Sequence, residues 1–161
     1  MANTNMKTLL AASKKITILL FFLSNFICLY SQNISNEFKQ DTARVEQKVR
    51  NMLDKDYSTY GMHEANKTLE IEYDKLLNKY YKILYNKLDD NGKKALKEAQ
   101  LNWIKFRDSE KELVAQLYQN TYNEEGGGTI WGVIYGNSAA QITRERVFVL
   151  YGYLVLDNLE E

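Results

Sequence analysis

Apolar residues recur every three to four positions along most of this chain, a spacing that predicts long helices. The clearest stripe predicts a helix from about Thr59 to Asp89. Its members are Leu69, Tyr73, Leu76, Leu77, Tyr80, Leu84 and Leu88. A weaker pattern predicts an earlier helix over residues 32–58, built on Phe38, Val45, Val49 and Met52. This earlier segment is either an additional packing helix or a mobile arm.

A turn signal, Asp89-Asp90-Asn91-Gly92, separates the second predicted helix from a third, which we expect to continue to about Tyr122. Two long helices joined by so short a link must pack antiparallel, as a hairpin. The apolar arc of the third helix is wider than the usual third of a helix circumference. We therefore expect this helix to be central and to touch more than one neighbour.

The pattern breaks between residues 123 and 137, a segment that holds five of the eight glycines. It is not a phosphate-binding loop, because no Gly-Lys-Ser/Thr follows and no strand precedes it. The segment is either a linker whose apolar residues pack on the core or a partner-binding loop with aromatic anchors. In the second case it presents Glu124, Glu125, Trp131 and Tyr135. A last helix is expected from Ser138, its N-cap, to about Leu159.

Six polar residues fall on helix faces that should be buried, and these are Asp74, Asn78, Gln100, Arg107, Glu110 and Arg146. Removing one partner of a buried ion pair costs about 3–5 kcal/mol, so the six should be mutually paired. Arg107 and Glu110 can meet on their own helix at i and i+3. By elimination, Arg146 should reach Asp74, or both arginines should share it. The network either fixes only the register of three helices or forms a polar site open to a ligand.

The N-terminus carries Lys7, Lys14 and Lys15 before an apolar run over residues 16–30. A positive flank, about fifteen apolar residues and a small polar exit are typical of a secretory signal peptide, here residues 1–31. A membrane anchor is the alternative, but the run is short of the about 20 residues that spanning needs. The residues around Cys28 do not match a lipoprotein signal. Cleavage after Ser31 leaves a mature chain without cysteine.

Charge and composition narrow the classes of function. The chain has 21 basic and 21 acidic residues, and losing residues 1–31 removes three lysines, which leaves a net charge of −3. A nucleic-acid binder would show a basic stripe, so nucleic acid is not expected as a partner. An enzyme is hard to build, because His63 is the only histidine and has no second histidine or cysteine at metal-ligand spacing. We expect no catalytic residue, metal or cofactor, and no membrane attachment after signal cleavage.

A family resemblance is carried by the stretch Ala99-Gln100-x-x-Trp103-x-x-Phe106-Arg107-Asp108. It is flanked by Asp74-x-x-Leu77-Asn78-x-x-Tyr81 and by Thr143-x-x-Arg146-x-x-x-Leu150. Together these motifs resemble the lysozyme inhibitor LprI-like domain, a bacterial envelope family, over roughly residues 62–154. Besides members of the polar network, the resemblance marks as signature positions Leu77, Tyr81, Trp103, Phe106, Asp108 and Thr143. It implies a small exported helical domain that inhibits lysozyme by binding it.

The sequence thus predicts an all-α fold, a long antiparallel helical hairpin with flanking N- and C-terminal helices. Residues 32–58 form an N-terminal extension, and residues 59–161 form the LprI-like helical domain. We expect a periplasmic or secreted binding protein whose partner is lysozyme or another envelope protein, and its mild acidity suits a basic lysozyme. The alternative is a structural or stress-related envelope protein with no enzyme target.

Overall fold

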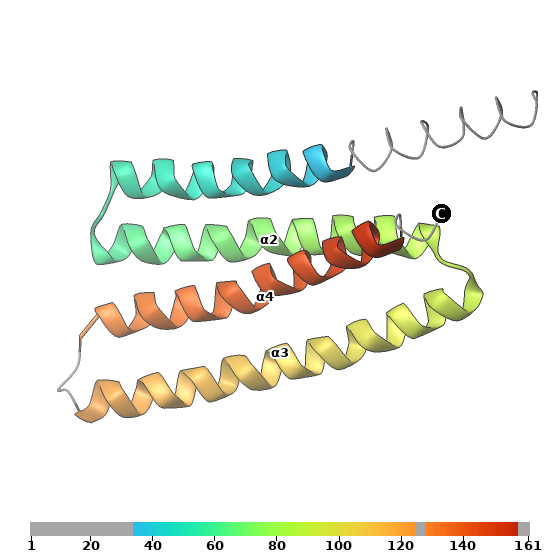
Figure 1. Cartoon of the computed structure of the whole chain (residues 1–161). Helices are drawn as coiled ribbons and strands as arrows, with labels where there is room; N and C mark the ends of the chain where they lie inside the picture. The colour runs from blue at the N-terminus through green and yellow to red at the C-terminus, as the bar shows by residue number, and fades with distance from the viewer. Residues whose placement is uncertain (1–33, 125–127, 158–161) are drawn as a thin grey trace, which may run out of the picture.

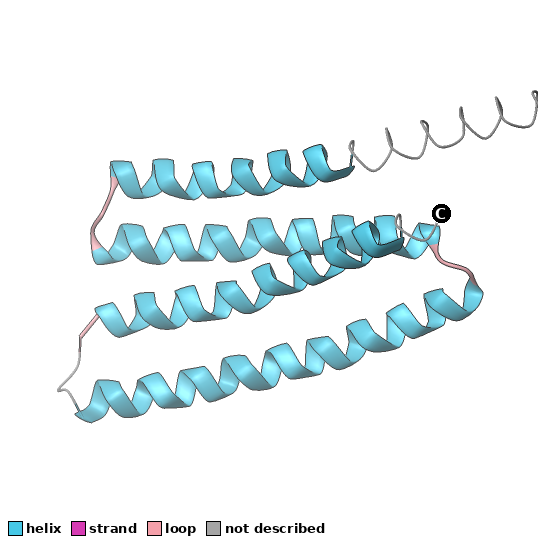
Figure 2. Ribbon diagram, viewed as in Figure 1, coloured by secondary structure: helices cyan, strands magenta, loops and turns pink. Residues whose placement is uncertain are grey.

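The computed structural model describes residues 34–124 and 128–157, which are helical apart from short turns and contain no strand. The first helix covers residues 34–55 and is called the N-terminal helix here. It is followed by α2 (Thr59–Lys87), α3 (Asp90–Glu124) and α4 (Ile130–Asp157), as Figures 1 and 2 show. The expected all-α fold is therefore confirmed. The expected signal peptide, with Cys28, and Glu125 of the expected loop lie outside the described residues.

The centre of the bundle is formed by α2 and α4, which make the most extensive helix–helix contact. The N-terminal helix lies along one side of this pair and α3 along the other (Figure 1). The largest side chains that are fully buried all come from the central pair, and they are Tyr73, Tyr80, Val147, Leu150 and Leu154. Burying an aliphatic side chain of this size contributes about 1.5–3 kcal/mol, so the α2–α4 contact supplies most of the core.

The N-terminal helix belongs to the packed body of the protein. The ring of Phe38 stacks on that of Tyr151 with centroids 3.8 Å apart and meets Tyr80 edge-on at 5.1 Å. Nearer its C-terminal end, Lys48 Nζ lies 2.8 Å from Glu72 Oε1 of α2. Of the two interpretations of this segment, the additional packing helix is therefore correct for residues 34–55.

The start of α2 depends on a close approach of the chain to itself. Ser58 is the N-cap, and its hydroxyl accepts a hydrogen bond from the Gly61 backbone N at 3.2 Å. A Cβ atom at Gly61 would lie 2.1 Å from the backbone oxygen of Asp56. Only glycine therefore allows the turn to fold back this tightly. At the next turn the Asp89 carboxylate accepts from the Gly92 backbone N at 2.7 Å, so α3 begins in the predicted turn.

The prediction of a loop over residues 123–137 is wrong for most of this segment. Helix α4 begins at Ile130, about two turns before the expected start, and Ser138 lies inside it. Gly132 and Gly136 lower helix propensity, but Gly132 lets α4 approach the His63 side chain of α2 closely. The Asn66 side chain donates to the Val133 backbone oxygen at 2.7 Å. Tertiary packing against α2 thus outweighs the local glycine signal.

Helix α3 is not central, contrary to the expectation from its wide apolar arc. Leu96 is its one buried residue among those described, whereas Leu101, Phe106, Leu113 and Leu117 are each more than half exposed. The two-residue link does make α2 and α3 antiparallel, but their direct contact is slight, and α3 packs mainly on α4. Helix α4 has apolar residues on all sides and takes the central position that the sequence pattern assigned to α3.

Candidate functional site

The polar network expected across three helices does not form as one unit. Asp74 and Asn78 are exposed on α2, where the Asn78 side chain donates to the Asp74 backbone oxygen at 2.8 Å. The other four members lie on α3 and α4 and are partly buried. The expected contact between Arg146 and Asp74 is therefore wrong, because Asp74 turns toward solvent.

The arginines on α3 and α4 meet around a tryptophan instead. Arg146 Nε donates to Gln100 Oε1 at 3.1 Å, and Arg107 donates to its neighbour Asp108 at 2.7–2.9 Å rather than to Glu110. The two guanidinium carbons lie 5.4 Å and 5.8 Å from the Trp103 ring centroid, within cation–π range. This cluster joins α3 to α4.

One polar atom of that cluster is buried without a partner. Within the described residues, Nη2 of Arg146 is buried and makes no hydrogen bond. Desolvation lowers the pKa of Arg146. Among the described residues no carboxylate pairs with this guanidinium, so its burial carries an electrostatic cost, and the cluster joins the two helices at that cost.

The best-paired buried polar groups are ones that the sequence analysis did not select. The Asp41 carboxylate is 4% exposed, accepts from the Tyr80 hydroxyl at 3.0 Å and forms an ion pair with Lys79. Its position between Phe38 and Val45, at helical spacing on the same apolar stripe, was the available signal.

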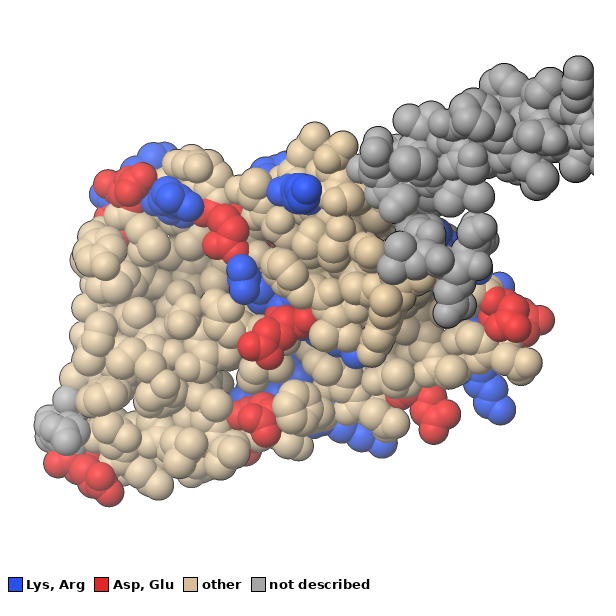
Figure 3. Space-filling view, in the orientation of Figure 1, with Lys and Arg blue, Asp and Glu red and all other residues tan. Residues whose placement is uncertain are grey.

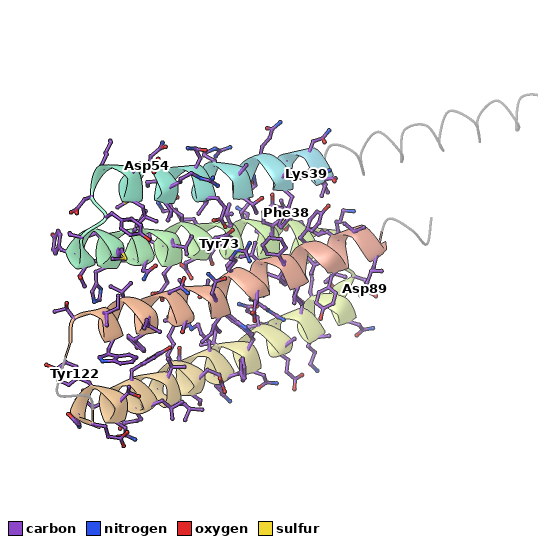
Figure 4. All side chains as sticks on the ribbon, turned by 60° about the vertical axis from the view of Figure 1, so that its left-hand side comes forward. Phe38, Lys39, Asp54, Tyr73, Asp89 and Tyr122 are labelled. Carbon is purple, nitrogen blue, oxygen red and sulfur yellow. The ribbon has the colours of Figure 1, made fainter. Side chains whose placement is uncertain are left out.

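A second missed group joins three helices, the N-terminal helix, α2 and α4. The Tyr73 hydroxyl donates to Glu46 Oε1 at 2.6 Å and accepts from Arg144 Nε at 3.2 Å. Burial and the hydrogen bond to Glu46 raise the pKa of Tyr73 to about 12. These contacts tie the N-terminal helix to α2 and α4, as the side chains around Tyr73 in Figure 4 illustrate. Tyr73 is buried, whereas the Glu46 and Arg144 side chains are 41% and 37% exposed, so these contacts lie at the edge of the core.

The remaining signature positions divide between core and surface. Leu77 and Thr143 are buried in the central pair, and Tyr81 is half-buried and stacks on Tyr85 with centroids 6.0 Å apart. Phe106 and Asp108, however, are more than half exposed on α3. An exposed phenylalanine is not explained by the packing of a single chain.

An aromatic pocket lies at the end of the bundle where α3 meets α4. It has a volume of about 450 Å³ and is lined by side chains from α2, α3 and α4. Its ring-bearing residues are His63, Tyr118, Tyr122, Trp131 and Tyr135. The Tyr118 ring centroid lies 6.4 Å from that of Trp131 and 6.3 Å from that of Tyr135, so three rings form one wall.

The aromatic pocket keeps two of the residues expected in a partner-binding loop and changes their setting. Trp131 and Tyr135 lie in the first turns of α4, so they are held by a helix rather than by a flexible loop. Glu124 is exposed at the C-terminal end of α3, beside the pocket. In Figure 3 this end of the molecule is a broad uncharged surface with acidic side chains at its lower edge. Tyr122 marks the same end in Figure 4.

The pocket brings together aromatic rings and one imidazole. His63 lines it and is exposed. Across the described ranges, no three His, Cys, Asp or Glu side chains come together in a way that could hold a metal ion. The same ranges contain no helix long and apolar enough to cross a bilayer.

The protein is a small all-α bundle with an aromatic pocket at one end. Comparison with protein families gives a match over residues 50–150 to the family described as Lysozyme inhibitor LprI. This match spans more than half of the chain, so the protein belongs to the LprI family. No curated protein and no solved structure matches the sequence.

Proposed function

We propose that this protein is a non-enzymatic envelope protein that binds lysozyme and inhibits it, with the aromatic pocket and Glu124 as the contact surface. Membership of the LprI family carries the proposal, because the family description names lysozyme inhibition. The all-α bundle, without a cluster of metal-ligating residues in the part that the structure describes, is compatible with a binding role.

The physical case for the aromatic pocket is the kind of residue that it gathers. Trp and Tyr dominate the hot spots of protein interfaces, since they bury a large area at low cost in side-chain entropy. Trp131 and Tyr135 are half-buried, and the Tyr118 hydroxyl lies 3.4 Å from Ser138 Oγ, so the wall is ordered before a partner arrives. Preorganised aromatic groups of this kind favour tight binding.

The net negative charge of the protein after its N-terminal segment favours a basic partner. The chain from Gln32 onward has a net charge of −3, and Glu124 at the C-terminal end of α3 is exposed. Attraction between an acidic protein and a basic lysozyme accelerates association. Export through the N-terminal segment, to the periplasm or the medium, would bring the inhibitor to the compartment in which lysozyme acts.

The test is the rate at which lysozyme degrades purified cell wall as increasing amounts of this protein are added. Dose-dependent inhibition is expected, and Trp131→Ala should weaken it by about tenfold or more, as for an interface hot spot. Leu101→Ala is the matched control, because Leu101 is an exposed apolar residue of α3 outside the pocket. It should inhibit like the unmodified protein.

Two results would contradict the proposal in different ways. If several lysozymes retain full activity at excess protein, inhibition is excluded and a structural role in the envelope becomes the better interpretation. If inhibition occurs but Trp131→Ala and Leu101→Ala behave alike, the family function holds and the contact surface lies elsewhere.

A further inference from the structure

Helix α3 carries an exposed apolar stripe that no part of the described chain covers. At about 100° per residue, its members fall within a sector of about 40°. These residues, called the outer seam, are Ala95, Ala99, Phe106, Leu113 and Leu117. Phe106, Leu113 and Leu117 are 54%, 51% and 56% exposed, which is unusual for three large apolar side chains on one helix face.

The spacing of the outer seam is that of a helix-pairing surface. Successive members are separated by four, seven, seven and four residues, and Asn102 fills a gap in this heptad pattern. The order is also symmetric about Phe106. Reversing the helix around this residue exchanges Ala95 with Leu117, Ala99 with Leu113, and Asn102 with Glu110.

The small residues of the outer seam border an apolar groove at the opposite end of the bundle from the aromatic pocket. The groove has a volume of about 440 Å³ and runs between the start of α3 and the end of α4. Its lining includes Gly92, Ala95 and Ala99 on α3 and Tyr153 and Leu156 on α4. Small side chains on α3 create this hollow, and the exposed rings and methyl groups of α4 form its other wall.

We propose that a second copy of this chain covers the outer seam, with its α3 antiparallel to the first and a twofold axis passing beside Phe106. In this arrangement Leu117 of the second copy lies over Ala95, and its Leu113 lies over Ala99. Both leucines then enter the apolar groove. The two Phe106 rings meet at the axis, and each Asn102 reaches the level of Glu110 in the other copy.

A second copy fits this surface because the outer seam is complementary to itself. Away from the axis, each leucine of the outer seam faces an alanine, which is how packed helices interdigitate. Both halves of the contact are identical, as a twofold interface requires. The Asn102 amide can donate to the Glu110 carboxylate, and a polar pair of this kind fixes register in a helix pair. The proposal is independent of lysozyme binding.

The first experiment measures mass in solution. The full chain is expressed, and the soluble protein recovered is examined by light scattering over a ~100-fold range of concentration, because assembly depends on concentration. We expect twice the mass of one chain for the unmodified protein and the mass of a single chain for Leu113→Glu. The control, Leu101→Glu, introduces the same charge at a residue of equal exposure outside the outer seam, and should keep the doubled mass.

The second experiment tests the register by cysteine cross-linking in a Cys28→Ser background, since Cys28 is the one cysteine of the chain. The double variant Ala95→Cys and Leu117→Cys should give a covalent dimer under mild oxidation. Within one chain these positions are about 33 Å apart along α3, far beyond disulfide reach. Neither single variant should cross-link, because antiparallel pairing separates each position from its own copy.

Each alternative outcome overturns the proposal. A single-chain mass for the unmodified protein at all concentrations excludes the second copy. A doubled mass that persists in Leu113→Glu places the contact on another surface. Cross-linking in the single variants as well as in the double variant would mean that the helices run parallel.

Discussion

The Tyr80 hydroxyl donates a hydrogen bond of 3.0 Å to Oδ2 of Asp41, and this contact links α2 to the N-terminal helix in the interior. The same carboxylate pairs with Lys79, so one buried acid serves two partners on neighbouring residues of α2. Burial and the bond to Asp41 raise the pKa of Tyr80 above the ordinary tyrosine range. The N-terminal helix is thus held by specific polar contacts as well as by Phe38.

Replacing Asp41 should destabilise the fold more than its place in a charged helix suggests. Asp41→Ala leaves the Tyr80 hydroxyl and Lys79 without their buried acceptor, and we expect the free energy of unfolding to fall by about 3 kcal/mol. Urea denaturation followed by circular dichroism measures the change. Asp54→Ala, on the exposed end of the same helix, should change it by less than about 0.5 kcal/mol. Equal losses in the two variants would contradict the role given to Asp41.

The pKa of Tyr73 predicts a dependence of stability on alkaline pH. Its folded-state value of about 12 exceeds its ordinary value of 10.0, so the folded protein holds this proton more tightly than the unfolded chain. The stabilisation is fully present below about pH 10 and is lost as pH rises through about 12. Tyr73→Phe removes it, at a cost of about 1 kcal/mol at neutral pH.

The measurement is the urea midpoint of both proteins between neutral pH and about pH 11.5. Other groups titrate in both proteins alike, so their effects cancel in the difference. We expect that difference to shrink as pH rises above about 10. A constant difference across the range would mean that the Tyr73 proton is not linked to folding.

Replacing two helix glycines by alanine should change the stability of the fold in opposite directions. At Gly61 the new Cβ would collide with the Asp56 backbone, which cannot move without breaking the α2 cap, and a loss of about 2 kcal/mol is expected. At Gly136 the nearest atom, from the Asn66 side chain, is 3.5 Å away, so helix propensity should prevail and raise stability by up to about 1 kcal/mol. Thermal unfolding temperatures compare the two variants. A lowered temperature for Gly136→Ala would contradict this account.

Arg146 and Asp74 should be energetically independent, because Arg146 bonds to Gln100 and Asp74 faces solvent. We expect the effects of Arg146→Met and Asp74→Ala to add within about 0.5 kcal/mol in the double variant. Urea denaturation of the two single variants and the double variant gives the coupling. A coupling above about 1 kcal/mol would restore the ion pair that the sequence suggested.

The features that sequence predicted well are those fixed by neighbouring residues. The apolar stripe from Leu69 to Leu88 gave α2 within about two residues at its end, and the Asp89–Gly92 turn gave the start of α3. Periodicity also placed Leu77 and Thr143 in helices that bury them. In each case the pattern needs no knowledge of which helix packs on which.

The features that the sequence analysis missed depend on tertiary packing. Glycines at positions 132 and 136 suggested a loop, yet α2 supplies the surface on which they form a helix. The width of the α3 apolar arc suggested a central helix, because an outer seam and an inner packing face look alike in one sequence. Asp41 seemed an ordinary charge, since nothing local indicates that Tyr80 and Lys79 of another helix would surround it.

The pairing of α2 with α4 also has a consequence for how fast the chain folds. The two helices that form the core are separated in sequence by all of α3, and neighbouring α2 and α3 barely touch. The α2–α4 contact can therefore form only after the chain has closed a long loop. Proteins whose native contacts span greater sequence distances fold more slowly, so this bundle should fold more slowly than one in which consecutive helices pack together.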